Sequence, residues 1–259
     1  MEVEKQPYYD FHVLGTNCYA IGGVWHHNSG KSSFCSLLRD FRIQRRNERC
    51  EVFLEPVDHP RFEKLLGLYY GTDSSQSGAG WDELDESARL SSSMSRWGFA
   101  LQIHALTERH AQHRLAIETV TSGVTVIQDR SIFADGCFGM VVRKDGNMRE
   151  EEWSIYCDLF GRMKRDLRYP DVMVYLRTDP KACWENMEER RRPQEKGVPL
   201  DYLKRIHEKH EVMVEEMARY TRVIRMDWNF KGQDMSEISN HIDKVAREDR
   251  IFLRDHRRL

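Results

Sequence analysis

The sequence predicts an α/β fold with a doubly wound parallel sheet, on three observations. Four short apolar runs bounded by polar or turn-forming residues are typical of buried parallel strands. Longer helical patterns lie between them, and strands that alternate with helices are typical of this fold class. Charged residues directly follow each run, at the carboxyl ends of strands, where open α/β sheets bind ligands. The runs are residues 52–54, 124–127, 172–176 and 223–226, and the clearest helical patterns are residues 97–117 and 151–167.

Composition narrows the class of protein. A chain of 259 residues suits one good-sized α/β domain with an appendage. Its 40 Lys and Arg nearly balance its 42 Asp and Glu, so we expect a small substrate with a local anion site, and no nucleic acid partner. The six cysteines show no CxxC pair or metal-ligand spacing, and no apolar stretch is long enough for a signal or membrane span. We therefore expect reduced thiols, a cytoplasmic location and no membrane partner.

Two segments carry no predicted chemistry. Residues 71–95 are rich in Gly and Ser and lack a periodic apolar pattern, which predicts a loop insertion. The basic residues 250–259 predict a solvated terminal helix or tail.

A phosphate-binding motif is only half present. Gly30, Lys31 and Ser32 lead into an apolar helical pattern, like the second half of a P-loop. In such a loop, backbone N–H groups and a helix N-terminus hold the phosphates, Lys31 neutralises the β- and γ-phosphate oxygens, and the Ser32 hydroxyl ligates Mg²⁺. The full pattern needs a glycine five residues before Gly30, where Trp25 stands. The expected phosphate-binding residues are Ser29, Gly30, Lys31, Ser32 and Ser33; a loop that merely contains Gly-Lys-Ser is the alternative.

Residues 9–28 resemble the C-terminal splicing segment of inteins. Tyr-Asp precedes an alternating strand, an aromatic-rich strand with glycine follows, and His27 and Asn28 stand directly before the hydroxyl of Ser29. A hydroxyl can accept an acyl group, an asparagine can cyclise and cleave its own peptide bond, and a histidine can move the proton. The resemblance implies that Ser29 is the nucleophile, that Asn28 cyclises and that His27 assists. The sequence departs from the pattern at Asn17, where a histidine is usual.

This resemblance implies a division of the chain. Residues 1–28 would be a short β C-terminal intein fragment, and residues 29–259 a domain that lacks its first strand and the first half of its P-loop. An N-terminal intein and extein half would supply both through protein splicing. The alternative is a native strand over residues 18–26 and a lengthened phosphate loop that begins at Gly23.

From residue 51 onward the motifs resemble those of the deoxynucleoside kinase family, in the family's order and over residues 29 to about 228. The matching motifs are Leu54-Glu55-Pro56-Val57, Leu65-Leu66-Gly67-Leu68-Tyr69-Tyr70, Trp97-Gly98-Phe99-Ala100-Leu101-Gln102 with Arg109, Asp129-Arg130-Ser131-Ile132-Phe133-Ala134-Asp135, and residues 195–203 with His207 and His210-Glu211. The resemblance implies a P-loop kinase fold with a helical lid. It also implies transfer of the γ-phosphate of ATP, with Mg²⁺, to the 5′-hydroxyl of a deoxynucleoside.

The catalytic roles follow from the same resemblance. A sugar hydroxyl is a poor nucleophile, and Glu55 matches the family's base, which takes its proton. Arg130 would bind the transferring phosphoryl group and Asp129 the Mg²⁺, with Lys31 on the ATP phosphates. The family often has Glu at the position of Asp129. Without the resemblance, Asp129 and Arg130 would equally suit a structural ion pair.

Further residues match the nucleoside site. Gln102 would hydrogen-bond a base edge, with the rings of Phe99 and Phe133 as walls, although aromatic residues at such spacings are more often simple core. A charged pair near the base occurs in the purine- and cytidine-preferring branches of the family. Two further residues of the family's site hold the sugar 3′-hydroxyl. The charged pair is Arg109 and Asp135, and the sugar residues are Tyr70 and Glu195.

The lid and the adenine loop complete the expected ATP site. Arg190 and Arg192 resemble the lid arginines that bring positive charge to the transition state, while a further family arginine is Asn186 here. Asp227 begins a segment that matches the adenine loop loosely.

Other functions stay open at this point. A nucleoside monophosphate kinase shares the P-loop, lid and sheet, but Glu55 is placed for an uncharged nucleoside. The chain as encoded could also be an inactive splicing fragment or a degenerate remnant. The family resemblance suggests a homodimer formed through helices beside residues 97–111.

Overall fold

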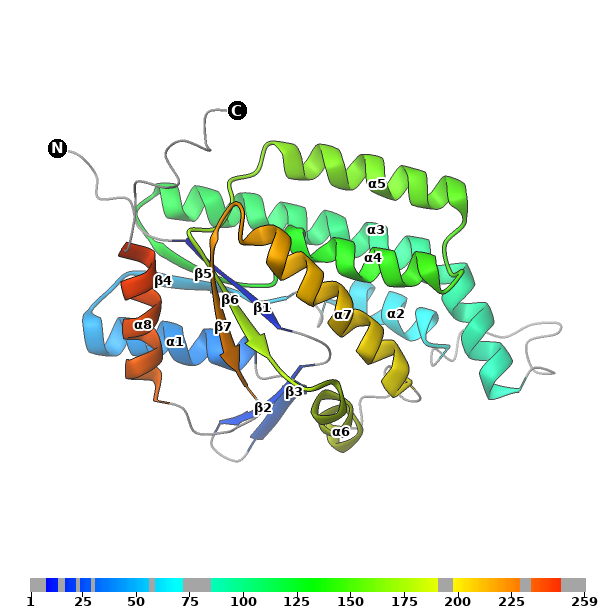
Figure 1. Ribbon diagram of the computed structural model, residues 1–259, viewed down its shortest axis with the longest axis horizontal. Helices are drawn as coiled ribbons and strands as arrows, with labels where there is room; N and C mark the ends of the chain where they lie inside the picture. The colour runs from blue at the N-terminus through cyan, green and yellow to red at the C-terminus, as the bar shows by residue number, and fades with distance from the viewer. Residues whose placement is uncertain are drawn as a thin grey trace.

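The core of the protein is a five-stranded parallel sheet with the strand order β4-β5-β1-β6-β7 (Figure 1). The computed structural model describes residues 8–13, 17–21, 24–28, 31–55, 59–71, 85–190, 198–228 and 234–247, with backbone alone for residues 8–33, 86, 190 and 247. The strands are β1 (Tyr8–Val13), β4 (Cys50–Phe53), β5 (Thr125–Asp129), β6 (Val172–Arg177) and β7 (Arg222–Asp227).

The four strands predicted from apolar runs are confirmed as β4, β5, β6 and β7 to within two residues at either end. Burial of both faces explains why they are continuous apolar runs. In β6, Met173 and Tyr175 face one hydrophobic core, whereas Val172, Val174 and Leu176 face another. The sheet therefore separates two cores, as the doubly wound prediction requires.

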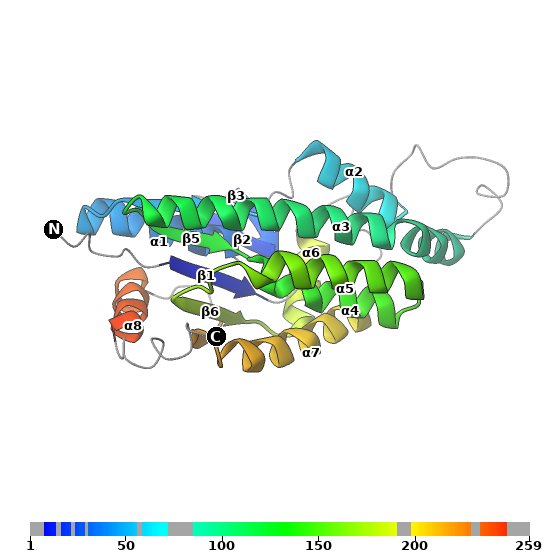
Figure 2. The ribbon, with the colours of Figure 1, turned by 90° about the horizontal axis from the view of Figure 1, so that it is seen from above.

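Helices cover both faces of the sheet. Helices α1 and α8 pack on one side, and α3, α4, α5 and α7 form the thicker layer on the other (Figures 1 and 2). The helices are α1 (Lys31–Arg46), α2 (Pro60–Tyr69), α3 (Glu86–Thr121), α4 (Asp135–Lys144), α5 (Glu150–Arg165), α6 (Pro180–Arg190), α7 (Leu200–Met217) and α8 (Met235–Arg247), with a 3₁₀ turn at Ile132–Ala134. The predicted helices at 97–117 and 151–167 are confirmed as parts of α3 and α5.

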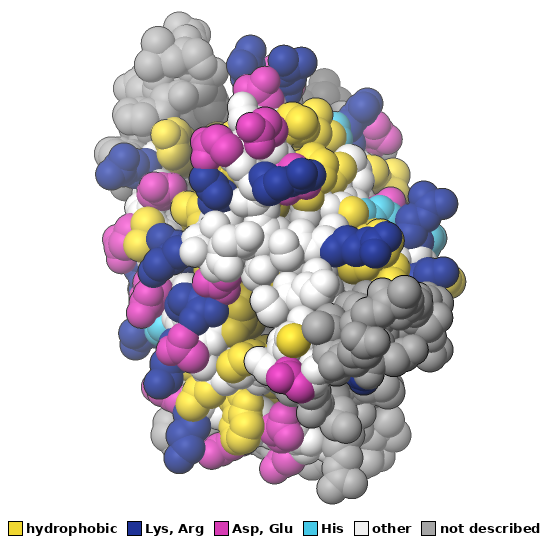
Figure 3. Space-filling model, turned by 90° about the vertical axis from the view of Figure 1, so that its right-hand side faces the viewer, with side chains coloured by type: hydrophobic (Ala, Val, Ile, Leu, Met, Phe, Trp, Pro, Cys, Tyr) yellow, Lys and Arg dark blue, Asp and Glu magenta, His cyan; other side chains and the backbone are white. Residues whose placement is uncertain are grey.

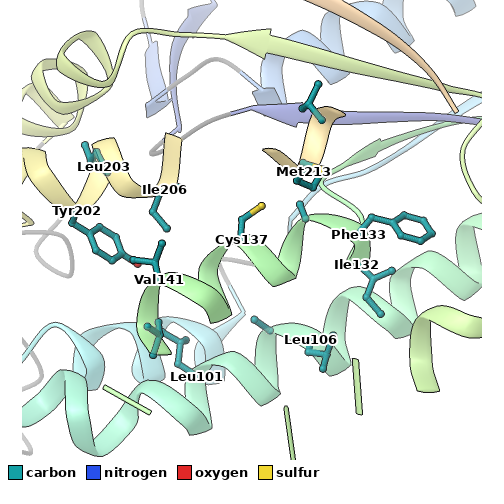
Figure 4. Packing of buried hydrophobic residues seen from close by; sticks show 14 of the residues in the cluster. Leu101, Leu106, Ile132, Phe133, Cys137, Val141, Tyr202, Leu203, Ile206 and Met213 are labelled. Atoms are coloured by element: carbon teal, nitrogen blue, oxygen red, sulfur yellow. The ribbon is translucent and has the colours of Figure 1, made fainter. Parts of the chain in front are cut away.

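The larger core lies where α4 is enclosed by α3 and α7 (Figure 4). Leu101 and Leu106 of α3 approach α4 from one side, and Tyr202 of α7 points toward Val141 of α4 from the other. All of these side chains are buried. This packing fixes the positions of α3 and α4, which carry most of the predicted nucleoside-binding residues.

Helix α3 begins earlier than the sequence predicted. Residues 86–95 were expected to be loop, yet they form its first turns; residues 72–84 of the predicted loop lie outside the described residues. Asp85 caps the helix, because its side chain accepts a hydrogen bond from the backbone N–H of Ala88 at 2.8 Å. Ser93 is fully buried. Tertiary packing and this cap outweigh the low helix propensity of the serines.

The segment with the intein resemblance takes part in the main sheet. β1 lies at its centre and pairs in parallel with both β5 and β6. After β1, the strands β2 (Asn17–Ile21) and β3 (Val24–Asn28) form a separate antiparallel hairpin before α1. A central strand must pair its own backbone groups with those of two neighbouring strands. The residue types of β1 favour the extended conformation that this pairing requires. The two predicted parts of the chain thus share one sheet, with the central strand from residues 8–13.

One face of the molecule carries charges of both signs. On the face that Figure 3 shows, Lys and Arg side chains are interspersed with Asp and Glu. Among the described helices, none has both the length and the apolar character needed to cross a membrane. The predicted basic tail at residues 250–259 lies outside the described residues.

Candidate active site

Four buried charged residues meet at the carboxyl edge of the sheet, and we call them the carboxylate–arginine cluster: Glu55, Arg109, Arg130 and Asp135. Glu55 Oε1 accepts one hydrogen bond from Arg130 Nη1 at 2.9 Å and a second from Arg109 Nη2. Arg109 Nη1 donates to Asp135 Oδ1. The structure therefore brings together four side chains that the sequence predicted to lie in one site.

Different elements position each member of this cluster. Glu55 follows β4 by two residues, Arg109 lies on α3, and Arg130 follows directly after β5. Asp135 is the first residue of α4, where the positive end of the helix dipole favours a carboxylate. Arg130 has a φ of +65°, an unusual conformation for a residue with a side chain. Such strain is typical of functional sites held by their surroundings.

The cluster is electrically balanced and shielded from water. Burial raises the pKa of Asp135 to about 6, although Arg109 and Arg130 oppose that change. Burial by itself lowers the pKa of Arg109, but the negative charges of Asp135 and Glu55 raise it by more. The net change is upward, so the guanidinium stays charged. Two carboxylates thus face two guanidinium groups with no net charge at neutral pH.

Gln102 and Phe99 lie on the same helix as Arg109. Gln102 is buried, and its Oε1 has no hydrogen-bond partner among the described residues, so this acceptor is available to a ligand. Phe99 packs against the larger core at its margin. The guanidinium of Arg130 lies 4.7 Å from the centre of the Phe138 ring, a contact that the sequence analysis missed.

Two other predicted nucleoside residues have well-defined neighbours. Tyr70 packs edge-on against Tyr69, and burial together with the nearby hydroxyl of Tyr202 raises its pKa well above the ordinary value. Tyr202 extends the predicted sugar-binding group by a second buried hydroxyl, whose pKa burial raises to about 12. Glu195, the other predicted sugar ligand, lies outside the described residues.

Phe133, which the sequence predicted as a wall of the base site, belongs to the larger hydrophobic core. Its ring stacks on Tyr169 at 4.5 Å between ring centres and meets His113 edge-on at 5.5 Å. These contacts make it a core residue, which is the more common role of an aromatic side chain in such a pattern.

The end of α1 that was predicted to bind phosphate lies at the same edge of the sheet. Phe34, in the first turn of α1, packs edge-on against Trp228, which directly follows β7, with 5.1 Å between ring centres. Asp227 is the last residue of β7, pairs in register with Arg177, and is exposed. The N-terminus of α1 therefore opens toward the edge that carries Glu55 and Asp129.

Several predicted phosphate and splicing residues are not described at the side-chain level. Ser29, Gly30, Arg192 and Glu195 lie outside the described residues, while for the others only the backbone is described. The latter are His27, Asn28, Lys31, Ser32, Ser33 and Arg190. Arg190 ends α6, the predicted lid helix, and Asn186 lies on the same helix.

Asp129 fits a role as a magnesium ligand. It is the last residue of β5, its carboxylate is fully buried beside Arg130, and oxygen is the ligand type that Mg²⁺ prefers. Mg²⁺ commonly binds through one or two carboxylates together with substrate phosphates. The described residues contain no cluster of three or more metal-ligating side chains, so a dedicated protein cage is not found among them.

The sequence analysis overlooked one polar residue beside the cluster. Tyr156 of α5 is buried, and the charges of Asp135 and Arg109 both act on its hydroxyl. It falls within an ordinary helical pattern of apolar residues, so only its placement in the fold distinguishes it from core.

Comparisons with known proteins identify the family of the chain. The family model described as "Deoxynucleoside kinase" matches residues 28–254. A deoxyadenosine kinase of Dictyostelium discoideum is 31% identical over 134 residues, which cover 52% of this chain and 54% of that protein. A probable deoxycytidine kinase of fowlpox virus (strain NVSL) is 31% identical over 192 residues, covering 73% of this chain and 68% of that protein. The chain spans about half the length of several curated relatives that it matches.

A solved structure shares the fold. The structure of deoxyadenosine kinase from M. mycoides with bound dATP matches with a TM-score of 0.62 and 18% identity, covering 93% of this chain and 99% of that chain. The family match reaches across nearly all of the sequence after residue 27. The chain belongs to the deoxynucleoside kinase family.

Proposed function

We propose that the protein transfers the γ-phosphate of ATP to the 5′-hydroxyl of a deoxynucleoside, with a purine deoxynucleoside or deoxycytidine preferred. The observation that carries this proposal is the buried carboxylate–arginine cluster at the carboxyl edge of a kinase sheet. A surface salt bridge contributes little and needs no burial, whereas a buried cluster of this kind is costly to desolvate. Its cost is understandable if the residues perform chemistry.

Glu55 and Arg130 have complementary roles in the proposed reaction. Glu55 takes the proton of the 5′-hydroxyl as the new P–O bond forms, which makes the oxygen a better nucleophile. Arg130 binds oxygens of the transferring phosphoryl group through its several N–H donors. The 2.9 Å hydrogen bond between the two side chains keeps base and guanidinium next to one another.

Arg109, Asp135 and Gln102 support the proposed base preference. Asp135 Oδ1 is held by Arg109, while Asp135 Oδ2 and Gln102 Oε1 have no partner among the described residues. Both are acceptors, and the exocyclic amines of adenine and cytosine are donors. Relatives named as deoxyadenosine and deoxycytidine kinases are consistent with this preference.

The ATP phosphates are assigned to the N-terminus of α1, with Lys31, Ser32 and the lid arginines Arg190 and Arg192. Mg²⁺, when bound, would neutralise charge on the β- and γ-phosphates. Asp129 would hold this ion from the end of β5, with Ser32 as its second protein ligand.

A direct assay tests the function. The spliced product, formed by mixing the chain with a partner that carries the missing strand and half-loop, would be incubated with ATP, Mg²⁺ and each of the four common deoxynucleosides in turn, and nucleotide products separated by chromatography. We expect 5′-monophosphates of deoxyadenosine, deoxyguanosine or deoxycytidine. Phosphorylation of a nucleoside monophosphate but of no nucleoside would contradict the proposal and favour a monophosphate kinase.

We further propose that residues 1–28 are a C-terminal intein segment and that an N-terminal intein and extein half completes the kinase. Trp25 stands where the P-loop pattern needs glycine, and the β2–β3 hairpin separates β1 from α1. A P-loop connects its strand directly to its helix, so the hairpin supports the idea of an inserted segment. Removal of residues 1–28 would also remove β1 from the centre of the sheet, so the other half must bring a replacement strand.

Intact mass measurement tests the splicing proposal. The chain would be mixed with a candidate partner that carries a strand and the glycine-containing half of the loop. We expect a mass loss that corresponds to residues 1–28, and an Asn28→Ala variant should not show it because alanine cannot cyclise. Kinase activity of the chain alone, without any mass change, would refute the splicing proposal and leave an unusual working phosphate loop.

Two broader assignments complete the proposal. We propose a homodimer formed through α3, to be checked by light scattering, where a mass of one chain would contradict it. We also propose the cytoplasm as the compartment, since the five cysteines whose side chains are described form no disulfide bond.

A further inference from the structure

Helix α4 presents glycine residues where helix α5 packs against it. Gly136 and Gly139 of α4 face the aromatic side chains of α5, whose rings are stacked in the order Trp153, Tyr156 and Phe160. The ring centres of Trp153 and Tyr156 are 5.5 Å apart, and those of Tyr156 and Phe160 are 6.0 Å apart. A Cβ atom at Gly139 would lie only 2.7 Å from two ring carbons of Tyr156. Glycine therefore allows the phenol end of Tyr156 to lie directly on the backbone of α4.

This contact brings the Tyr156 hydroxyl beside the carboxylate–arginine cluster. The hydroxyl oxygen would be 2.9 Å from a Cβ at Gly139, which is four residues after Asp135 and thus on the same face of α4. The charges that act on the hydroxyl include Asp135 and Arg109, although burial is the larger cause of its raised pKa. The hydroxyl of Tyr156 therefore lies on the face of α4 that carries Asp135, one helical turn further along.

Besides Nε of Arg109, three polar atoms at this end of the site have no hydrogen-bond partner among the described residues. They are the hydroxyl of Tyr156, Oδ2 of Asp135 and Oε1 of Gln102, and each belongs to a side chain that is at least nine-tenths buried. Buried polar groups without partners are uncommon in folded proteins because water is not there to replace the lost hydrogen bonds. Three of them from α3, α4 and α5 point to a ligand that supplies the missing partners.

We propose that Tyr156 is a further nucleoside-binding residue, whose hydroxyl donates a hydrogen bond to a ring nitrogen of an amino-bearing base. The proposal rests on the proposed function of the site. The carboxylate oxygen and the amide oxygen can only accept, whereas the phenol can donate. An adenine or cytosine edge offers an amine donor next to a ring nitrogen acceptor, which complements this set. Thymine and hypoxanthine present an N–H next to a carbonyl instead. The carbonyl oxygen of such a base would face the carboxylate and amide oxygens of the site, so that acceptors would face acceptors.

The variant Tyr156→Phe tests this role, because it keeps the ring and its stack but removes one oxygen. We expect the dissociation constants of deoxyadenosine and deoxycytidine to rise about tenfold, as for a lost hydrogen bond to a buried acceptor. Binding of deoxyinosine, which has a carbonyl in place of the amine, should change less than twofold. Calorimetric titration of the full chain measures all three and does not depend on catalysis.

Thermal unfolding separates ligand binding from a structural role. Without ligand, Tyr156→Phe should unfold at the same temperature as the parent or higher, since a buried hydroxyl without a partner is removed. With saturating deoxyadenosine, its stabilisation should be smaller than that of the parent. The control is Tyr175→Phe, in which a buried tyrosine loses a hydroxyl that donates to Glu211 at 2.9 Å. This control should unfold at a lower temperature and keep the parent's affinity for each nucleoside.

The possible outcomes are distinct. If the parent binds deoxyadenosine and Tyr156→Phe binds it equally well, the role proposed for Tyr156 is wrong while the proposed function stands. A lower unfolding temperature of ligand-free Tyr156→Phe with unchanged affinity would likewise assign the hydroxyl to the core. If the parent neither binds nor phosphorylates any deoxynucleoside, the proposed function fails, and the role of Tyr156 fails with it.

Discussion

We expect Arg42→Met to lower the free energy of unfolding by about 3 kcal/mol, because it removes a buried guanidinium that pairs with two partly exposed carboxylates far from the candidate site. Arg42 lies on α1 and is only 1% exposed. Its Nη1 donates to both carboxylate oxygens of Glu48, at 2.8 and 3.1 Å, and its Nη2 donates to Asp243 of α8. The side chain thus joins α1 to α8 and to the segment before β4.

The magnitude follows from what remains after the substitution. Removal of one partner of a buried ion pair typically costs about 3–5 kcal/mol, since the other charge stays buried. Here Glu48 keeps a 2.9 Å hydrogen bond from Thr125, and Asp243 keeps its pair with Arg46, so the lower end applies. A loss of about 3 kcal/mol changes the unfolding equilibrium about 150-fold and lowers the midpoint temperature by about 6–12 °C.

Urea unfolding followed by circular dichroism measures this loss. The matched control is Arg39→Met on the same helix, because Arg39 pairs with Asp40 at the surface, with 36% and 43% of the two side chains exposed. A surface pair of this kind contributes about 0–1 kcal/mol. If Arg42→Met costs no more than Arg39→Met, the buried ion pairs do not hold α8 to the domain. If the added changes Glu48→Met and Asp243→Leu restore no stability, the loss reflects packing rather than charge.

Three further predictions concern the site and its helices. Glu55→Gln should lower kcat by about 10²–10⁴-fold with little change in the KM for ATP, measured by steady-state kinetics, because the amide cannot take the proton. Since burial raises the pKa of Asp135 to about 6, the nucleoside KM should rise as pH falls through 6 and stay constant above it; Asp135→Asn should show no such rise. Gly98→Ala should destabilise the protein by about 1–3 kcal/mol, because the added Cβ would lie 2.6 Å from a backbone oxygen. Gly161→Ala places its Cβ in open space on α5 and should stabilise the protein by about 0.5–1 kcal/mol. Urea unfolding measures both changes.

The strands from β4 onward could be predicted because a sheet buried on both faces needs unbroken apolar runs. Residues 172–176 show this best, since alternate side chains of β6 fill two different cores. The charged residues that follow these runs also gave the edge where the site forms. Such features depend on local sequence alone.

The central strand could not be predicted, because its place depends on its neighbours. Residues 9–13 alternate apolar and polar side chains, which suits a strand of many kinds, and only pairing with β5 and β6 assigns residues 8–13 to the sheet. The start of α3 was missed for a related reason. Ser91, Ser92 and Ser93 favour a loop locally, whereas the Asp85 cap and the burial of Ser93 favour a helix.

The candidate site was predictable in its charged residues and not in its neutral ones. Glu55, Arg109, Arg130 and Asp135 could be found because their motifs resemble those of the deoxynucleoside kinase family, whose site residues match these positions. Tyr156 could not be found, because a tyrosine in an amphipathic helix is usually core. Its significance comes from Gly139 on a different helix, which no pattern within α5 reveals.

The two proposed substrates need different electrostatic environments, and the fold separates them. A site without net charge suits an uncharged nucleoside, since an unbalanced charge in the site would lose its contact with water each time a nucleoside bound. The carboxylate–arginine cluster meets this condition with two charges of each sign. A triphosphate instead requires positive potential, which a helix N-terminus and flexible basic side chains supply. Arg130 is assigned to both environments in the proposed reaction. It is paired with Glu55 and held at a strained φ of +65° directly after β5. That strain has a physical reason if one guanidinium must remain in the neutral cluster and still reach the phosphoryl group as it passes to the nucleoside.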